Sequence, residues 1–228
     1  EMGISDISYL NFTREMSQMS AISFLSDILV KKYHPLVIVV GYDTHFGVNK
    51  QGNMALLVEY EDRFGYTVHK IPPYIVEGNT ISSTLIRSLI AEGKVAEAYK
   101  YLGYHYSITG RVMHGQQIGR IISVPTTNLQ PLEPNKLIPN NGVYFTRTKV
   151  KGQVFYGATN IGVAPTLRDE EIVQIETHLL DFSRDIYDEE IEVSFIEKIR
   201  NERKFGSMIE LKKQIDADIQ IVRKMING

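Results

Sequence analysis

The sequence predicts an α/β domain followed by an all-β domain, and a change of pattern along its 228 residues supports this division. Up to about residue 104, apolar runs typical of buried strands alternate with segments of helical periodicity. Beyond it, short strand-like segments alternate with Gly, Pro and Asn, and no helical period appears until near the end of the chain. The first pattern is typical of a doubly wound α/β domain and the second of a small barrel or sandwich. We therefore expect two domains, residues 1–104 and 105–228.

The first part contains two clear strands. Residues 36–40 form a continuous apolar run that ends at Gly41, which predicts a strand buried on both faces, as in a parallel sheet. Residues 67–71 predict a second strand. Because doubly wound sheets usually have about five or six strands, these residues supply only part of such a domain. Helices are expected after Ser20, over residues 52–64, from about Ser82 to Gly93, and over residues 95–102.

The second part predicts several strands and one final helix. Residues 142–150 and 154–156, joined by Lys151-Gly152, are typical of a hairpin. Further strands are expected over residues 172–180 and 191–196. Ser207 followed by Glu210 predicts a capping box at the start of the last helix. The apolar face expected for that helix consists of Leu211, Ile215, Val222 and Ile226.

The composition excludes several classes of protein. Lys and Arg number 25 and Asp and Glu 27, and a net charge of −2 argues against a dedicated nucleic-acid binder. A hydrophobic content of 43% is sufficient for a packed core. The absence of cysteine excludes disulfides and thiolate chemistry and suits a reducing compartment. No apolar run approaches the ~18–20 residues that span a bilayer. We expect a cytoplasmic protein with neither nucleic-acid nor membrane partners; its oligomeric state stays open.

The densest motif lies between Gly110 and Arg120, with Gly115 and Gly119 between them. Glycines allow backbone amides to approach a polyphosphate closely, and Arg120 adds a fixed cation. This arrangement favours an ATP site. The alternative is that these glycines only interrupt strands and turns, since loose glycine patterns are common.

Thr126 and Asn128 follow this motif. They are two residues apart on an extended segment and therefore point to one face, where they offer two neutral oxygens. Mg²⁺ prefers oxygen ligands and usually arrives with substrate phosphates. We therefore expect Mg²⁺ to bind here only together with ATP. Alternatively, Asn128 is simply a turn residue.

Glu176 is the candidate base. On a strand it shares a face with Gln174 and His178, whereas Ile175 and Thr177 face the other way. Taken alone, such a glutamate is better explained as a solvated strand residue, because most glutamate side chains are exposed. The nearby alternatives for a base are His178, Asp181 and Asp185.

A second candidate site lies at the start of the helix that follows Ile81. The hydroxyl groups of Ser82, Ser83 and Thr84, with Arg87 one turn further on, would form an anion site at the helix N-terminus. The alternative is a serine N-cap with a surface arginine.

The second part of the sequence resembles riboflavin kinases. The glycine-rich motif that leads into Pro-Thr-x-Asn at residues 125–128 is similar to that of the family. The resemblance implies a six-stranded antiparallel barrel with a C-terminal helix, which transfers the ATP γ-phosphoryl group to riboflavin and yields FMN. The match continues in order through residues 142–144, 160–162, 165–166, 175–182, 199–202, 205 and 211–218.

The resemblance also implies roles for individual residues. Thr126 and Asn128 fall on the positions that bind Mg–ATP, and Glu176 falls on the catalytic carboxylate. Arg200 and Phe205 match a segment that lies near the flavin, although Phe205 could equally anchor the final helix. One departure is Ser123-Val124, where the family normally has Gly-Phe.

The first part resembles bacterial FMN adenylyltransferases through residues 81–87 and 39–47 with Gly52, apart from Thr44 and Lys50, which replace Phe and Arg. The whole chain thus resembles the bifunctional riboflavin kinase/FMN adenylyltransferase, or FAD synthetase, of bacteria. The family's His-x-Gly-His loop for ATP phosphates has no counterpart, because all six histidines are isolated. We therefore expect the sequence to begin inside the adenylyltransferase domain and, by itself, not to make FAD.

Three functions remain open from the sequence. The first is an ATP- and Mg²⁺-dependent riboflavin kinase. The second is an adenylyltransferase whose kinase half is inactive. The third is a flavin-binding or regulatory barrel without catalysis, although such a protein would need neither a metal site nor a base.

Overall fold

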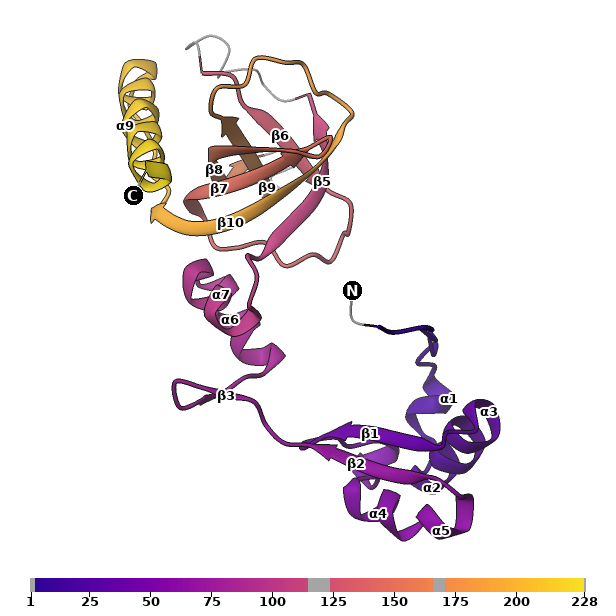
Figure 1. The fold of residues 1–228 in the computed structure, drawn as a ribbon. Coiled ribbons are helices and arrows are strands. Elements are labelled where there is room, and N and C mark those ends of the chain that lie inside the picture. The colour runs from indigo at the N-terminus through magenta and orange to yellow at the C-terminus, as the bar shows by residue number, and fades with distance from the viewer. Residues whose placement is uncertain (1–2, 115–123, 166–170, 228) are drawn as a thin grey trace. The chain divides into compact units, whose positions relative to one another are not determined.

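The computed structural model describes residues 3–114, 124–165 and 171–227, and the chain forms two compact units, Glu1–Thr80 and Ile81–Gly228 (Figure 1). Helices α6 (Ser83–Ala91) and α7 (Val95–Leu102) belong to the second compact unit, together with the barrel that follows them. The bounds of α6 and α7 confirm the helices that the sequence predicts before and after Gly93. The domain boundary near residue 104 stays a prediction.

The first unit contains a two-stranded parallel sheet. Strand β1 (Val37–Gly41) pairs with β2 (Thr67–Ile71) in register from end to end. Both strands occur where the sequence predicts them, and their parallel pairing confirms the α/β character of this part. The small core beside the sheet is built on Leu25, Leu57 and Tyr66, and the Tyr66 hydroxyl donates to the Leu57 carbonyl at 2.6 Å.

The helices of the first unit follow the predicted order with one difference. The segment expected after Ser20 is helical to Tyr33, and Ser20 caps it by accepting from the Ser23 amide at 3.0 Å. The helix expected over residues 52–64 is divided at Tyr60, where the backbone leaves helical values. The bounds are α1 Arg14–Ser17, α2 Ala21–Ser23, a π-helical segment Phe24–Val30, α3 Lys31–Tyr33, a 3₁₀ turn Val48–Lys50, α4 Met54–Glu59 and α5 Glu61–Phe64, followed by the hairpin β3 Ile75–Val76 and β4 Asn79–Thr80.

The second unit is built around a closed antiparallel barrel (Figure 1). Its strands neighbour one another in the order β10-β5-β6-β9-β8-β7, and β7 pairs with β10 to close the ring. This confirms the six-stranded barrel that the family resemblance implies. The strands are β5 Ser107–Met113, β6 Thr127–Pro131, β7 Gly142–Val150, β8 Gln153–Pro165, β9 Glu171–Leu179 and β10 Glu190–Arg200.

Alternation along β9 decides which side chains enter the barrel. Ile175, Thr177 and Leu179 are buried, whereas Glu176 and His178 are only partly buried. Successive side chains of a strand point to opposite faces, so this pattern confirms the predicted division of faces. The candidate base therefore lies outside the barrel core.

The final helix, α9 (Met208–Asn227), packs along the barrel. Half of the predicted capping box is present, because the Glu210 amide donates to Ser207 Oγ at 3.3 Å, whereas the Glu210 carboxylate accepts from the Gly206 amide at 3.2 Å rather than from that of Ser207. The prediction is wrong for Ile226, which is 39% exposed, because the buried stripe runs through Val222 to Met225. Since a helix turn has 3.6 residues, such a stripe advances by three residues as well as by four.

Candidate active site

A row of three polar side chains crosses the outside of the barrel. In the strand register, Asn128 of β6 lies opposite Glu176 of β9, and Glu176 lies opposite Asn160 of β8. Directly opposite residues of an antiparallel sheet share a face, with their Cβ atoms about 4.5–5.5 Å apart. We call these residues the outer row. The structure thus brings together two predicted site residues, Asn128 and Glu176, and adds Asn160, to which the sequence assigned no role.

Glu176 differs from the other acidic candidates in its surroundings. Burial raises the pKa of its carboxyl group, and within the described part of the chain no hydrogen bond or ion pair engages it. Asp181 instead pairs with Arg223 at 2.7 Å, and Asp185 accepts from the Tyr187 amide at 3.1 Å. Glu176 is therefore the carboxylate here that is open to a substrate.

Threonines form a second row on the inner face of the same strands, which we call the inner row. Thr146 and Thr159 hydroxyls lie 2.7 Å apart, Thr159 and Thr177 hydroxyls 2.9 Å apart, and Thr127 donates to the Thr177 carbonyl at 3.2 Å. Thr146, Thr159 and Thr177 are fully buried. On β6, β9 and β8 these positions are one residue away from the outer row, so bonds inside the barrel fix the register of the side chains outside it.

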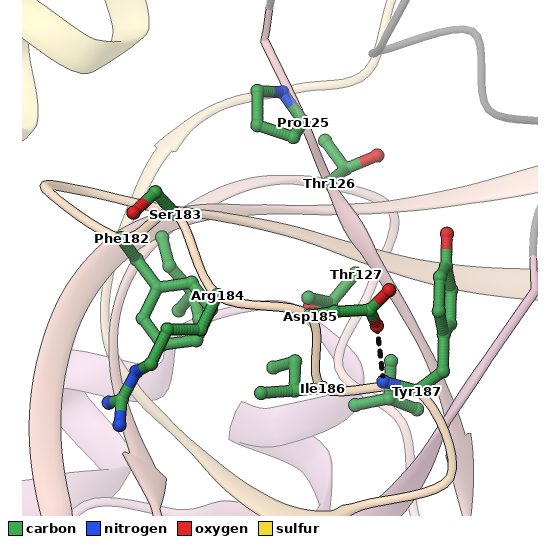
Figure 2. A pocket seen from close by; sticks show the side chains of 11 residues that line it. Pro125, Thr126, Thr127, Phe182, Ser183, Arg184, Asp185, Ile186 and Tyr187 are labelled. Atoms are coloured by element: carbon green, nitrogen blue, oxygen red, sulfur yellow. Dashed lines mark hydrogen bonds between the residues drawn. The ribbon is translucent and has the colours of Figure 1, made fainter.

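A pocket of about 360 Å³ opens beside Thr126 (Figure 2). It lies between residues 125–127 and the loop of residues 182–187 that connects β9 to β10. Val112, Leu179 and Ile186 supply apolar lining, and the ring of Tyr187 stacks on His114 with centroids 3.7 Å apart. The pocket therefore combines apolar and aromatic surface with a threonine hydroxyl at its edge, as binding sites for small molecules commonly do.

Thr126, which lines this pocket, and Asn128, two residues further along the chain in the outer row, suit a hard cation that brings its own negative ligands. Thr126 and Asn128 can offer only neutral oxygens, which are ligands that Mg²⁺ accepts alongside phosphate. Among the described residues no cluster of three or more His, Cys, Asp or Glu could hold a metal alone. The residues therefore fit Mg²⁺ that arrives with a nucleotide. Gly115, Gly119, Arg120 and Ser123, which the sequence placed beside this site, lie outside the described residues.

Gly110 has a packing explanation. It lies on β5 opposite Pro131, and a Cβ atom there would come 2.5 Å from the Gln130 carbonyl and 2.7 Å from Leu129. Any side chain at this position would push β6 away from β5. Its role in ATP binding stays a prediction. Val124, at the departure from the family motif, is buried and so keeps an apolar side chain at that position.

Arg200 is held in a buried ion pair that the sequence did not predict. Its guanidinium donates to Asp218 of α9 at 2.8–3.1 Å, and Gln214 donates to the same carboxylate at 2.8 Å. Asp218 is 2% exposed. The pair therefore ties the end of β10 to α9. Phe205 lies 5.9 Å from the Arg200 guanidinium and 4.7 Å from that of Arg203. The flavin-binding roles of Arg200 and Phe205 stay predictions.

A second carboxylate, which sequence reasoning missed, lies beside the outer row. Asn141 donates to Glu202 at 3.3 Å, and a Cβ atom on Gly162 would overlap the Glu202 carboxyl group. Gly162 is two residues from Asn160 on β8 and faces the same side. The glycine therefore leaves the space that Glu202 occupies.

The candidate anion site around Arg87 begins with a capped helix. Ser82 accepts from the Leu85 amide at 3.2 Å at the start of α6, and Ser83, Thr84 and Arg87 are exposed. The bond is the one expected of a serine N-cap. The anion-binding role of these four residues stays a prediction.

Gly52, from the other adenylyltransferase motif, lies in the first unit. It exchanges two backbone hydrogen bonds with Phe46, and a Cβ atom there would come 2.5 Å from the Phe46 ring. A glycine is therefore required for this packing, whatever else the motif does.

The fold and the site match a known class of phosphotransferase. Residues 102–226 match the family described as riboflavin kinase, and residues 1–85 match the family described as FAD synthetase. The barrel thus carries a riboflavin kinase module, and the module before it is of the nucleotidyltransferase class.

Curated relatives identify the family more closely. The chain is 37% identical over 219 residues to a Haemophilus influenzae protein, covering 95% of this chain and 70% of the relative. It is 38% identical to a Buchnera aphidicola protein (98% and 72% covered) and 36% identical to an Escherichia coli K12 protein (96% and 69%). All three are named bifunctional riboflavin kinase/FMN adenylyltransferase. The chain belongs to this family of bifunctional enzymes.

A solved structure supports the fold. A Streptococcus pneumoniae protein described as a macrolide-efflux protein superposes with a TM-score of 0.83 at 32% identity, over 94% of this chain and 68% of that one. No helix within the described ranges of our chain is long and apolar enough to cross a membrane. The solved structure supports the fold, and the family assignment rests on the family matches and the curated relatives.

Proposed function

We propose that the barrel phosphorylates the 5′-hydroxyl of riboflavin with Mg–ATP and that Glu176 is the base of this reaction. The observation that carries the proposal is the outer row. It presents one partly buried carboxylate, without a bonding partner in the described chain, between the amides of Asn128 and Asn160. A carboxylate in this position can accept a hydrogen bond from an incoming hydroxyl group, and the flanking amides can orient it.

The timing of proton transfer follows from the two pKa values involved. A glutamate titrates near 4.3 and a hydroxyl like that of water near 15.7, so forming an alkoxide in advance would cost about 15 kcal/mol. Even with the pKa raised by burial, Glu176 is far too weak a base for that step. It therefore orients the hydroxyl group and accepts its proton late, as the phosphoryl group is transferred.

The nucleotide occupies the pocket beside Thr126 in this proposal. Its aromatic and apolar lining suits a planar base, and Thr126 and Asn128 face the phosphates with neutral oxygens. Mg²⁺ bound with ATP would neutralise charge that develops on the phosphoryl oxygens. Because neither protein ligand is charged, the protein without nucleotide should bind Mg²⁺ weakly. Tight uptake of Mg²⁺ in a calorimetric titration without nucleotide would contradict this arrangement.

The flavin lies beyond the outer row, near residues 200–205. Arg200 is engaged by Asp218, so it positions this segment rather than offering a free cation. Phe205 is partly buried and can stack on the isoalloxazine ring. The proposed assembly places the 5′-hydroxyl group at Glu176, between the nucleotide and the flavin sites.

A second activity, adenylylation of FMN to FAD, is favoured by the match of residues 1–85 to FAD synthetases. Ser82, Ser83, Thr84 and Arg87 would contact ATP phosphates in that reaction. We place both reactions in the cytoplasm, with riboflavin, FMN and ATP as the molecules bound.

One assay tests both activities. The protein is incubated with riboflavin, ATP and Mg²⁺, and the flavins are separated by chromatography. FMN supports the kinase function, and FAD in addition supports both reactions. Unchanged riboflavin would contradict the proposed function.

A further inference from the structure

The segment that carries Thr126 is held to its neighbour by few backbone pairs. In the register of the described strands, β6 pairs with β9 through Thr127 with Thr177 and Asn128 with Glu176. Strand β6 begins at Thr127, so Thr126 lies just before it. The backbone ladder alone therefore leaves the position of Thr126 relative to Glu176 poorly determined.

The side chain of His178 supplies a further connection at this point. Its Nδ1 lies 2.8 Å from the carbonyl oxygen of Pro125, across a sequence separation of 53 residues. A carbonyl oxygen can only accept, so Nδ1 carries the proton and donates it. If the pairing of β6 and β9 continued by one residue, His178 would lie opposite Thr126. The imidazole thus supplies a hydrogen bond between β9 and the segment before β6, at the position where the backbone pairing has ended.

The same contact fixes the orientation and the tautomer of the His178 ring. In the neutral imidazole that makes this bond, Nδ1 is the donor and Nε2 is left as the acceptor. Glu176, two residues earlier on the same face of β9, has no such bond within the described chain.

We propose that His178 is a positioning residue for the nucleotide side of the active site. By holding the Pro125 carbonyl, its Nδ1–H fixes Thr126 at the edge of the pocket beside Asn128. The inference rests on the proposed function, in which Thr126 and Asn128 face Mg–ATP. It goes further by assigning to β9 both the base, Glu176, and the residue that places the nucleotide ligand relative to that base.

The hydrogen bond can be removed and restored by substitution. His178→Leu removes the donor and keeps an apolar side chain, whereas His178→Asn keeps an amide donor close to the position of Nδ1. A matched control is His69→Leu, because His69 is an exposed strand histidine of the other compact unit. For each variant, binding of Mg–ADP and of riboflavin is measured separately by calorimetry, with KM and kcat for both substrates alongside.

His178→Leu should weaken Mg–ADP binding and raise the KM for ATP about three- to tenfold, the value of one lost hydrogen bond. Its riboflavin affinity should stay within about twofold of the starting protein, because no contact with the flavin side is removed. His178→Asn should recover most of the nucleotide affinity, and His69→Leu should change neither ligand.

Three results would overturn the inference. They are unchanged Mg–ADP binding in His178→Leu, equal losses of nucleotide and flavin affinity, or an asparagine variant as weak as the leucine variant. Should His178→Leu fail to fold, His178→Gln replaces it with the same expectation, because its amide corresponds to Nε2. Since the calorimetry needs no turnover, a protein that makes no FMN would contradict the proposed function while the role of His178 is still tested.

Discussion

The inner and outer rows of the barrel use the same strands for opposite purposes. In the inner row, Thr146, Thr159 and Thr177 are fully buried and bonded to one another. In the outer row, one residue away on β6, β8 and β9, Glu176 is only partly buried and has no partner within the described chain. The comparison teaches that the polar groups that hold the register and those that meet substrate are alternate residues of the same strands.

The two rows depend on each other through the register. A shift of β9 by one residue would move Glu176 into the barrel and Thr177 out of it. That shift would bury a carboxylate without a partner and break the threonine bonds, and both changes are costly. The inner row therefore protects the chemistry of the outer row without touching substrate.

The largest effect should come from Glu176→Gln. The amide keeps the shape and a hydrogen bond but cannot accept a proton, so kcat should fall about 10²–10⁴-fold. Affinities for Mg–ADP and riboflavin should stay within about threefold, because neither ligand site is altered. Single-turnover formation of FMN measures the chemical step directly. Turnover equal to that of the unaltered protein would remove Glu176 from the role of base.

The opposite result is expected from Thr159→Val in the inner row. This change removes the hydroxyl that joins Thr146 to Thr177, and the free energy of unfolding should fall by about 1–3 kcal/mol. At a temperature where the variant is folded, kcat should stay within about twofold. Urea denaturation monitored by circular dichroism gives the stability.

Thr148→Val is the matched control for that change. Thr148 is equally buried on the neighbouring part of β7, but its hydroxyl has no partner among the described residues. Replacing an unsatisfied hydroxyl group by a methyl group should leave stability unchanged or increase it. Equal losses in both valine variants would mean that packing, rather than the hydrogen bonds of the row, stabilises the barrel.

Only the outer row, through Glu176, should add a smaller, pH-dependent effect on stability, because the threonines of the inner row do not titrate. Burial raises the pKa of Glu176 in the folded protein, so the folded state holds this proton more tightly than the unfolded state. The free energy of unfolding therefore falls as the pH rises from the ordinary glutamate pKa through the raised one.

Glu176→Gln removes this penalty and should be more stable than the unaltered protein at pH 7. The advantage should disappear below the ordinary pKa, where both states are protonated. Denaturation curves at pH 7 and pH 4 check this. A glutamine variant that is less stable at pH 7 than at pH 4, relative to the unaltered protein, would show that the carboxylate is stabilised rather than penalised by its surroundings.

The features that could be predicted from the sequence are those that depend on the residue pattern within a single segment. The bounds of β2 and α7, the division of faces on β9, and the position of Glu176 all follow from alternation or helical period within one segment. The inner row and the bond from His178 to Pro125 could not be found in this way, because they depend on which residues of distant strands lie opposite each other. Asp218 left a signal, since a single acid within the apolar stripe of α9 requires a partner.

The smallest expected effect is a change in the KM for riboflavin, which tests whether the outer row extends to Glu202. Gly162→Ala would place a methyl group where the Glu202 carboxyl group now lies, 3.2 Å from the Asn160 amide nitrogen. Because Glu202 is exposed and its side chain is flexible, it can move aside, and stability should change by no more than about 0.5 kcal/mol. If Glu202 belongs with the substrate-facing groups, the KM for riboflavin should rise about two- to fivefold, with the KM for ATP unchanged.

Glu202→Ala should reproduce that rise in KM, because it removes the same carboxylate without altering the strand. If instead both variants keep the KM of the unaltered protein, the groups that meet substrate end at Asn160, and the space left by Gly162 serves only the packing of residue 202. If both variants raise the KM for riboflavin, Glu202 is a second carboxylate that belongs with the outer row. Its position beyond Asn160, on the side away from Asn128, would then place it on the riboflavin side of Glu176 and away from the nucleotide.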